Sequence, residues 1–178
     1  TLMSEPILPL RLASSQPDSG WIRLSFLDIP QISINCTFVD DPFPNMITWL
    51  ETLVSGQSHA AWEVSEEGSS THIFFASDSS FIGAYSDHLV LSRSSNFIWQ
   101  VAGITTTRRA IVDGFYTAFR AMIEAPEYQG QHWHLPEAFY LPDVVNDPEA
   151  EDDNTFDGSF LPNLRSSLIE TWLFEPKA

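Results

Sequence analysis

His132 and His134 are the first residues of this chain whose types and spacing could do chemistry. In an extended segment, side chains at positions i and i+2 lie on the same face. Two imidazoles on one face, with a nearby carboxylate as third ligand, could bind zinc and serve a metal-dependent enzyme. No further His or Cys stands at ligand spacing, and His59, His72 and His88 are distant in the sequence. We therefore expect no bound metal or other cofactor and keep the metal-dependent enzyme as an alternative.

A second candidate is the acidic run at 152–158, which is similar to a calcium-binding loop. If Asp153 takes the first ligand position, Asp157 takes the fifth and Gly158 the sixth. The twelfth position, where such loops need a bidentate glutamate, is then Leu164. The sequence also contains no GxSxG run and no glycine-rich phosphate loop, and Cys36 lies in an apolar alternation. We expect the protein not to be an enzyme.

Charge is the strongest feature of the composition. Eight basic residues, seven of them arginine, stand against 24 acidic ones, which gives a net charge of −16. Such a chain repels nucleic acid and anionic membranes and attracts cationic proteins. We expect a basic protein partner, no nucleic acid and no membrane; whether the chain is a monomer or a homodimer stays open.

The acids concentrate in the irregular segment 127–160, which lacks helical or strand periodicity. Three aromatic residues there, Trp133, Phe139 and Tyr140, are of the kinds that dominate interface energetics. Eight carboxylates follow from position 137 and could pair with the lysines and arginines of a partner: Glu137, Asp143, Asp147, Glu149, Glu151, Asp152, Asp153 and Asp157. We predict that these residues bind the partner. The alternative is a flexible, solvated loop.

The elements that must position this segment begin with a strand that leads into a helix at 31–56. Apolar and polar residues alternate up to Val39, as in a half-buried strand. Asp40 and Asp41 offer N-cap oxygens, and Gly56 suits a left-handed helix end. Apolar residues recur at helical spacing between them. We predict a helix over 42–55.

Short alternating runs elsewhere predict an antiparallel sheet. Strands are expected within 5–39, at 5–12, 21–26 and 31–39, with a polar turn at 14–20. A β-meander is expected over 59–102, with strands at 59–64, 71–76, 81–85, 89–92 and 97–102. The turns between them are expected at 66–68, 78–80 and 86–88. We interpret Glu66 and Glu67 as part of a solvated turn.

Two further helices complete the expected fold. The first spans 105–125, with threonine caps at its start, and Gly114 inside it could permit close packing against the sheet. The second spans 162–173. We predict one α+β domain over 1–178, built from a twisted antiparallel sheet of about six to eight strands. The three helices are expected mainly on one face.

Two observations bear on the compartment. No apolar run approaches the ~20 residues that a membrane-spanning helix needs, and no secretory leader is visible. The single cysteine cannot form an internal disulfide, which favours a reducing environment. We expect a cytoplasmic protein.

A series of short landmarks runs along the chain: Val39-Asp40-Asp41-Pro42, Trp49-Leu50-Glu51, Gly56, the strand and acidic turn from Trp62 to Gly68, Phe115-Tyr116, Phe119, and a closing run with Leu164, Arg165, Ser166, Ile169, Glu170 and Leu173. Their order resembles that in a group of bacterial single-domain proteins, several of which are immunity proteins of toxin–immunity systems. The resemblance implies an antiparallel α+β domain and an inhibitor role, and it transfers no catalytic residue. The leading expectation is an immunity protein that occludes the basic active site of a cognate toxin, for example a nuclease. A scaffold or regulatory subunit is a further alternative.

Overall fold

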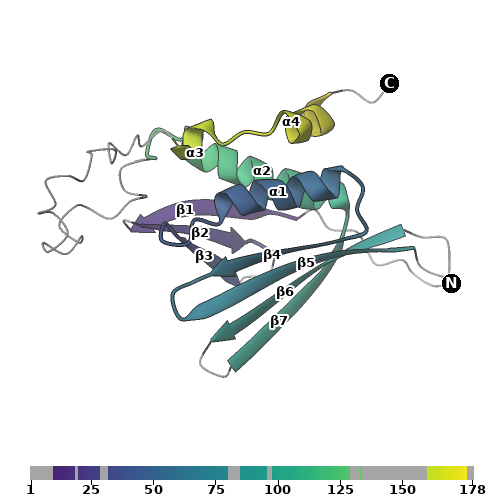
Figure 1. Ribbon diagram of the computed structural model, residues 1–178, viewed down its shortest axis with the longest axis horizontal. Coiled ribbons are helices and arrows are strands. Elements are labelled where there is room, and N and C mark those ends of the chain that lie inside the picture. The colour runs from purple at the N-terminus through teal and green to yellow at the C-terminus, as the bar shows by residue number, and fades with distance from the viewer. Residues whose placement is uncertain are drawn as a thin grey trace, which may run out of the picture.

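The computed structural model describes residues 10–18, 20–28, 32–79, 85–95, 98–128, 133 and 160–175. Within them the fold is α+β, as predicted. The strands form two antiparallel sheets, one of three strands and one of four, where the sequence predicted a single sheet. Figure 1 shows the two sheets side by side beneath the helices.

The three-stranded sheet has the order β1-β2-β3, with β1 at Leu12–Asp18, β2 at Trp21–Phe26 and β3 at Ser33–Thr37. The predicted hairpin of β2 with β3 is confirmed, with Ile22 opposite Cys36 and Leu24 opposite Ile34. The predicted turn at 14–20 is wrong, because most of it belongs to β1. This polar strand forms because its backbone pairs with β2, and tertiary pairing overrides the weak local signal. The predicted strand at 5–12 falls mostly outside the described residues.

The four-stranded sheet has the order β4-β5-β6-β7, with β4 at His59–Ser65, β5 at Ser69–Ser79, β6 at Tyr85–Ser95 and β7 at Ile98–Thr106. The predicted antiparallel meander is confirmed among the described residues, with longer strands than expected. The predicted turn at 78–80 is wrong for residues 78 and 79, which lie in β5, and most of the predicted strand at 81–85 lies outside the described residues. The predicted turn at 86–88 is wrong, since those residues lie inside β6 opposite 76–78 of β5. Their polar side chains suggested a turn, yet an antiparallel ladder accepts polar residues on a face that is open to solvent.

The hairpin between β4 and β5 turns at Glu67 and Gly68, which both have positive φ, 49° and 108°. Such a two-residue turn matches the twist of the flanking strands. The predicted solvated turn is right for Glu67, which is exposed, and wrong for Glu66, which is buried. The Glu66 carboxylate accepts a hydrogen bond from Thr71 at 2.6 Å and one from Asn35 of β3 at 3.3 Å. It therefore links the two sheets.

Helix α1 (Phe43–Val54) confirms the predicted helix at 42–55. The Asp41 carboxylate accepts a hydrogen bond from the Phe43 amide at 3.0 Å, and Gly56 follows the helix with φ of 90°. Met46 and Leu50 of the apolar stripe of α1 are fully buried, and Val54 at its end is partly buried. Cys36 on β3 is buried as well, as the alternation predicted.

Helix α2 (Arg108–Glu124) begins three residues later than predicted, because β7 continues to Thr106. The Thr107 hydroxyl caps it by accepting from the Ala110 amide at 3.1 Å. Gly114 lies where α2 crosses β1, and a Cβ there would stand 3.0 Å from the Leu10 carbonyl oxygen. The close approach that the sequence suggested for this glycine is confirmed.

The predicted helix at 162–173 is two shorter helices, α3 (Phe160–Asn163) and α4 (Ser167–Phe174). Ser166 stands between them in an extended conformation, and its hydroxyl accepts from the Ile169 amide at 3.2 Å. This N-cap starts a new helix and so breaks the apolar periodicity that suggested a continuous one.

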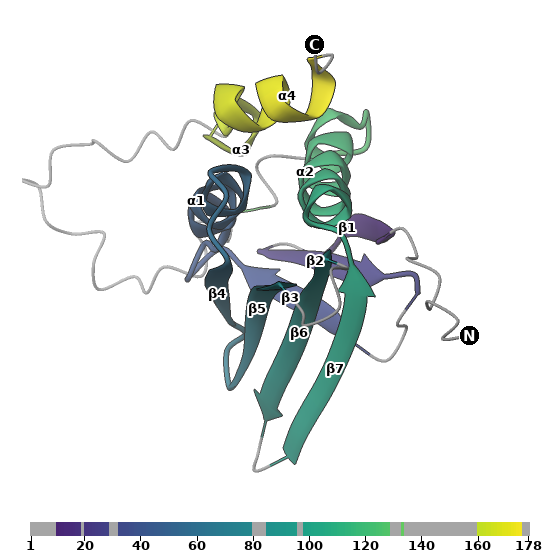
Figure 2. The ribbon, with the colours of Figure 1, turned by 90° about the vertical axis from the view of Figure 1, so that its right-hand side faces the viewer.

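Figures 1 and 2 show three layers. Helices α1 and α2 lie against the sheets, and α3 and α4 lie across α1 and α2 on the far side. The expectation of three helices packed on one face of the sheet therefore holds only for α1 and α2. The core is the apolar space between these two helices and the inner faces of both sheets.

Gly114→Ala provides a test of the packing of α2. Alanine normally stabilises a helix interior by about 1 kcal/mol relative to glycine. Here the added methyl group would press on a backbone oxygen that cannot rotate away, so we expect a lower melting temperature. Gly103→Ala in β7 is the control, because a Cβ there meets nothing within 4 Å. A gain of stability in Gly114→Ala would contradict this packing.

Candidate functional site

Most of the residues that the sequence nominated for function lie outside the described part of the chain. These are the metal candidates His132 and His134, the aromatic residues Phe139 and Tyr140, and the eight acids Glu137, Asp143, Asp147, Glu149, Glu151, Asp152, Asp153 and Asp157. Their roles stay predictions. Among the described residues, no group of three or more His, Cys, Asp or Glu side chains could hold a metal ion.

Trp133 is the one nominated residue that the structure describes, and it belongs to the core. Its side chain is 2% exposed, and its ring lies 5.4 Å from that of Phe43, between centroids. Its indole also hydrogen bonds to Asp41, whose carboxyl pKa is raised by burial despite this bond. A side chain in this position cannot project toward a partner, so we withdraw Trp133 as a surface anchor.

Two arginines at the start of α2 hold the ends of other helices. The Arg108 guanidinium donates to the carbonyl oxygens of Leu53 and Gln57, both at 2.9 Å, at the end of α1. The Arg109 guanidinium donates to the carbonyls of Trp172 and Leu173 at the end of α4. Cations at helix C-termini interact favourably with the helix dipole.

Two further arginines connect α2 to the segment between α3 and α4. Arg120, which is 8% exposed, binds Glu124 and donates to the Pro162 carbonyl at 3.1 Å. Arg165 bridges Glu124 at 2.8 Å and Glu170 at 3.0 Å. Glu170 also accepts from the Tyr116 hydroxyl at 2.7 Å.

The other three arginines lie on the sheets. Arg93 forms an ion pair with the buried carboxylate of Glu66 at 2.8 Å, and Arg11 forms one with Asp28 at 2.6 Å. Arg23 donates to the Asn35 side-chain oxygen at 3.0 Å. All seven arginines of the chain therefore donate to acceptors of the chain itself. Many carboxylates on the described surface have no such cation beside them.

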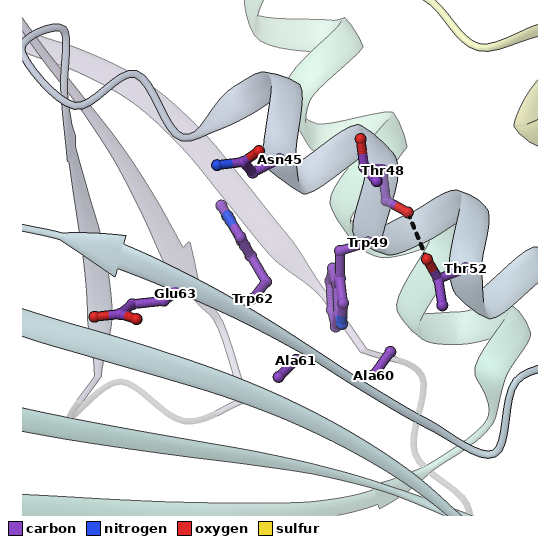
Figure 3. A pocket seen from close by; sticks show the side chains of 8 residues that line it. All are labelled: Asn45, Thr48, Trp49, Thr52, Ala60, Ala61, Trp62 and Glu63. Carbon is purple, nitrogen blue, oxygen red and sulfur yellow. Dashed lines mark hydrogen bonds between the residues drawn. The ribbon is translucent and has the colours of Figure 1, made fainter.

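A groove lies between α1 and β4. We call it the α1–β4 groove. It has a volume of about 350 Å³ and is lined by Asn45, Thr48, Trp49 and Thr52 of α1 and by Ala60, Ala61, Trp62 and Glu63 of β4. This volume lies within the range of ordinary ligand pockets. Figure 3 shows the two elements facing each other across it.

Two indole N–H groups in the lining have no hydrogen-bond acceptor. Trp49 and Trp62 are each 3% exposed, their rings stack with centroids 5.7 Å apart, and both Nε1 atoms are buried without a partner. In Figure 3 the Trp62 nitrogen lies on the side of its ring nearest Asn45, and the Trp49 nitrogen lies on the side nearest β4. A buried donor without an acceptor costs about 1–3 kcal/mol, so such groups are rare in native proteins.

The backbone of β4 also contributes polar groups to the groove. The Glu66 amide donates to the Ser69 carbonyl at 2.8 Å, and the Ser77 amide donates to the Ser58 carbonyl at 2.7 Å. Because hydrogen-bonded pairs alternate along an antiparallel ladder, the N–H and C=O groups of Ala61 and Glu63 point away from β5. They face the outer edge of β4, where the described residues add no further strand.

Cys36 is the single cysteine of the chain, and it is buried. Burial raises the pKa of the Cys36 thiol well above its ordinary value, and the charges of Glu66 and Asp41 add to the effect. A thiol in this state is a poor nucleophile. No helix among the described residues has the length and apolarity needed to cross a membrane.

Comparisons with models of protein families, with curated proteins and with solved structures find no match to this chain. The sequence alone did not predict the groove, because its residues belong to two regular elements. The residue types of these elements nevertheless indicate a polar recess. The stripe of α1 opposite its apolar face carries Asn45, Thr48 and Thr52, and two tryptophans stand on the facing elements.

The link between α2 and α4 predicts a pH dependence of stability. Hydrogen bonds from Arg120 hold the pKa of Glu124 below its ordinary value, with a smaller contribution from Arg165. A carboxylate with a lowered pKa stabilises the fold above its unfolded pKa, and this stabilisation is lost as the pH falls through the folded value. Glu124→Gln should therefore lower the urea midpoint at pH 7, and its difference from the wild type should shrink below about pH 4.5.

Glu127→Gln is the matched control, because it removes an exposed acid that lies close by in the sequence and outside this network. The urea midpoint of Glu127→Gln should stay near that of the wild type at every pH from 7 to acid. A difference between Glu124→Gln and the wild type that stays constant from pH 7 to acid would contradict the assigned role of Glu124.

Proposed function

We propose that this protein binds and neutralises a basic protein partner, and that it is an immunity protein for a cognate toxin. The observation that carries the proposal is that every arginine donates a hydrogen bond to an acceptor of the same chain. Each guanidinium binds an acceptor within the chain, and 24 acidic residues stand against eight basic ones, so a partner meets mainly carboxylates. Such a surface suits a cationic protein and disfavours nucleic acid.

The proposed mechanism is occlusion without chemistry. A toxin that acts on nucleic acid needs a basic active site, and carboxylates of an inhibitor can occupy the positions of its phosphate ligands. The acids between Glu137 and Asp157 would supply these carboxylates, and Phe139 and Tyr140 would supply apolar anchors. The resemblance to immunity proteins supports the same role.

The experiment uses toxin domains encoded beside the gene of this protein. Each is co-expressed with the full chain, and growth and binding affinity are measured. We expect protection by the wild type. The variant Asp147→Asn, Glu149→Gln, Glu151→Gln, Asp152→Asn should lose protection, with affinity weakened about tenfold or more, because its carboxylates no longer pair with basic groups.

The control variant is Asp40→Asn, Glu67→Gln, Glu127→Gln, Glu175→Gln, which removes four exposed acids elsewhere and changes the net charge equally. It should retain most of the protection. Equal affinity of both variants and the wild type for the toxin would contradict the proposal, and so would a lack of binding to every neighbouring toxin domain.

A further inference from the structure

We propose that the α1–β4 groove binds an extended, basic peptide segment, which adds to the edge of β4 where the described residues place no further strand. This inference extends the proposed function, because it assigns a place for one segment of the partner. It rests on groups distant in sequence from the acidic residues 137–157, and so it can fail separately.

The first support is the pair of unpaired donors. Trp49 and Trp62 bury their N–H groups in the lining of the groove without an acceptor. A peptide is rich in suitable acceptors, since every residue carries a carbonyl oxygen. Carbonyls that enter the groove would remove the cost of two unsatisfied buried donors, and small movements of the indoles would bring them into contact.

The second support is the edge of β4. The N–H and C=O groups of Ala61 and Glu63, two residues that line the groove, point away from β5 and have the spacing of an antiparallel or parallel partner strand. Peptides commonly bind by adding a strand to such an edge. The four lining residues of β4 span roughly 10 Å, enough to pair with about three residues of an extended peptide.

The third support selects the charge of the peptide. Glu63 stands at one end of the groove, its side chain is 64% exposed, and in Figure 3 its carboxylate projects outward. No lysine or arginine lines the groove. A second copy of this chain, with a net charge of −16, would be repelled, whereas a lysine or arginine of the peptide would be attracted.

The test uses a library of random linear ten-residue peptides, selected on the purified full chain. We expect enrichment of peptides that combine Lys or Arg with β-branched residues. Protein labelled with ¹⁵N-tryptophan reports the site, since it gives six indole N–H signals. The signals of Trp49 and Trp62, assigned with Trp49→Phe and Trp62→Phe, should shift on addition of an enriched peptide.

Two variants test the geometry. Thr48→Arg fills the groove from the exposed side of α1 and should weaken peptide binding about tenfold or more. Thr117→Arg, the same change at an exposed position of α2 outside the groove lining, is its control and should bind normally. Ala61→Pro removes the outward N–H and leaves the pairing of β4 with β5, so affinity should fall about three- to tenfold.

Several results would overturn the inference. They are the absence of enriched peptides, equal binding to Thr48→Arg and Thr117→Arg, and shifts that spare both Trp49 and Trp62. The inference would also be overturned if a small amide bound in the groove while no peptide did. Because no toxin is used, failure here leaves the co-expression test unaffected, and loss of protection there leaves this binding measurable.

Discussion

The packing of Phe115 joins α2 to α1 and to both sheets. Its ring meets Phe26 of the three-stranded sheet, Trp49 of α1 and Trp62 of the four-stranded sheet, with centroid distances of 5.8, 5.2 and 5.9 Å. All three contacts are edge-to-face, the arrangement that the charge distribution of aromatic rings favours. One side chain of α2 thus fixes both sheets and the other large helix. It also fixes the two indoles that line the α1–β4 groove, so the geometry of the groove follows from the core.

The charged side chains of the molecule have two separate roles. The described arginines hold helix ends or pair with carboxylates of the chain, as Arg108 does for the end of α1 and Arg93 does for the buried Glu66. A buried pair such as Glu66–Arg93 contributes little net stability, although removing one partner would be costly. The Glu66 carboxylate joins the sheets through Asn35 of β3, while Thr71 and Arg93 hold it within the four-stranded sheet. The negative charge that remains outside is free to act on other molecules.

The sequence predicts the elements whose signals are local. Helix α1 has its apolar stripe and its terminal glycine where the pattern placed them, whereas Pro42 and not an aspartate takes the N-cap position, and Asp41 accepts from the Phe43 amide. The local sequence patterns fail where strand pairing or a helix cap decides the structure. Strand β1 is polar and exists because β2 lies beside it, and β6 passes through Ser86 and Asp87, which resemble a turn. Ser166 divides the final helix by a cap that periodicity does not reveal.

The same distinction between local patterns and long-range contacts applies to the candidate site. Burial of Trp133 depends on contact with Phe43, which is 90 residues away in the chain, so no local pattern could distinguish it from a surface anchor. The groove likewise needs the juxtaposition of α1 with β4 and the alternation of the β4 ladder. Composition predicts the sign of the charge and hence the class of partner, whereas contacts decide which residues are free to meet it.

The most direct test of the central claim is the association rate constant of the full chain with a toxin domain encoded beside its gene, measured against ionic strength. Attraction between a surface of net charge −16 and a basic site is screened by salt. We predict a rate constant that falls steeply, by about tenfold or more, between low and high salt. A rate constant that does not change with salt would contradict the claim that carboxylates of this protein steer and occlude a basic partner.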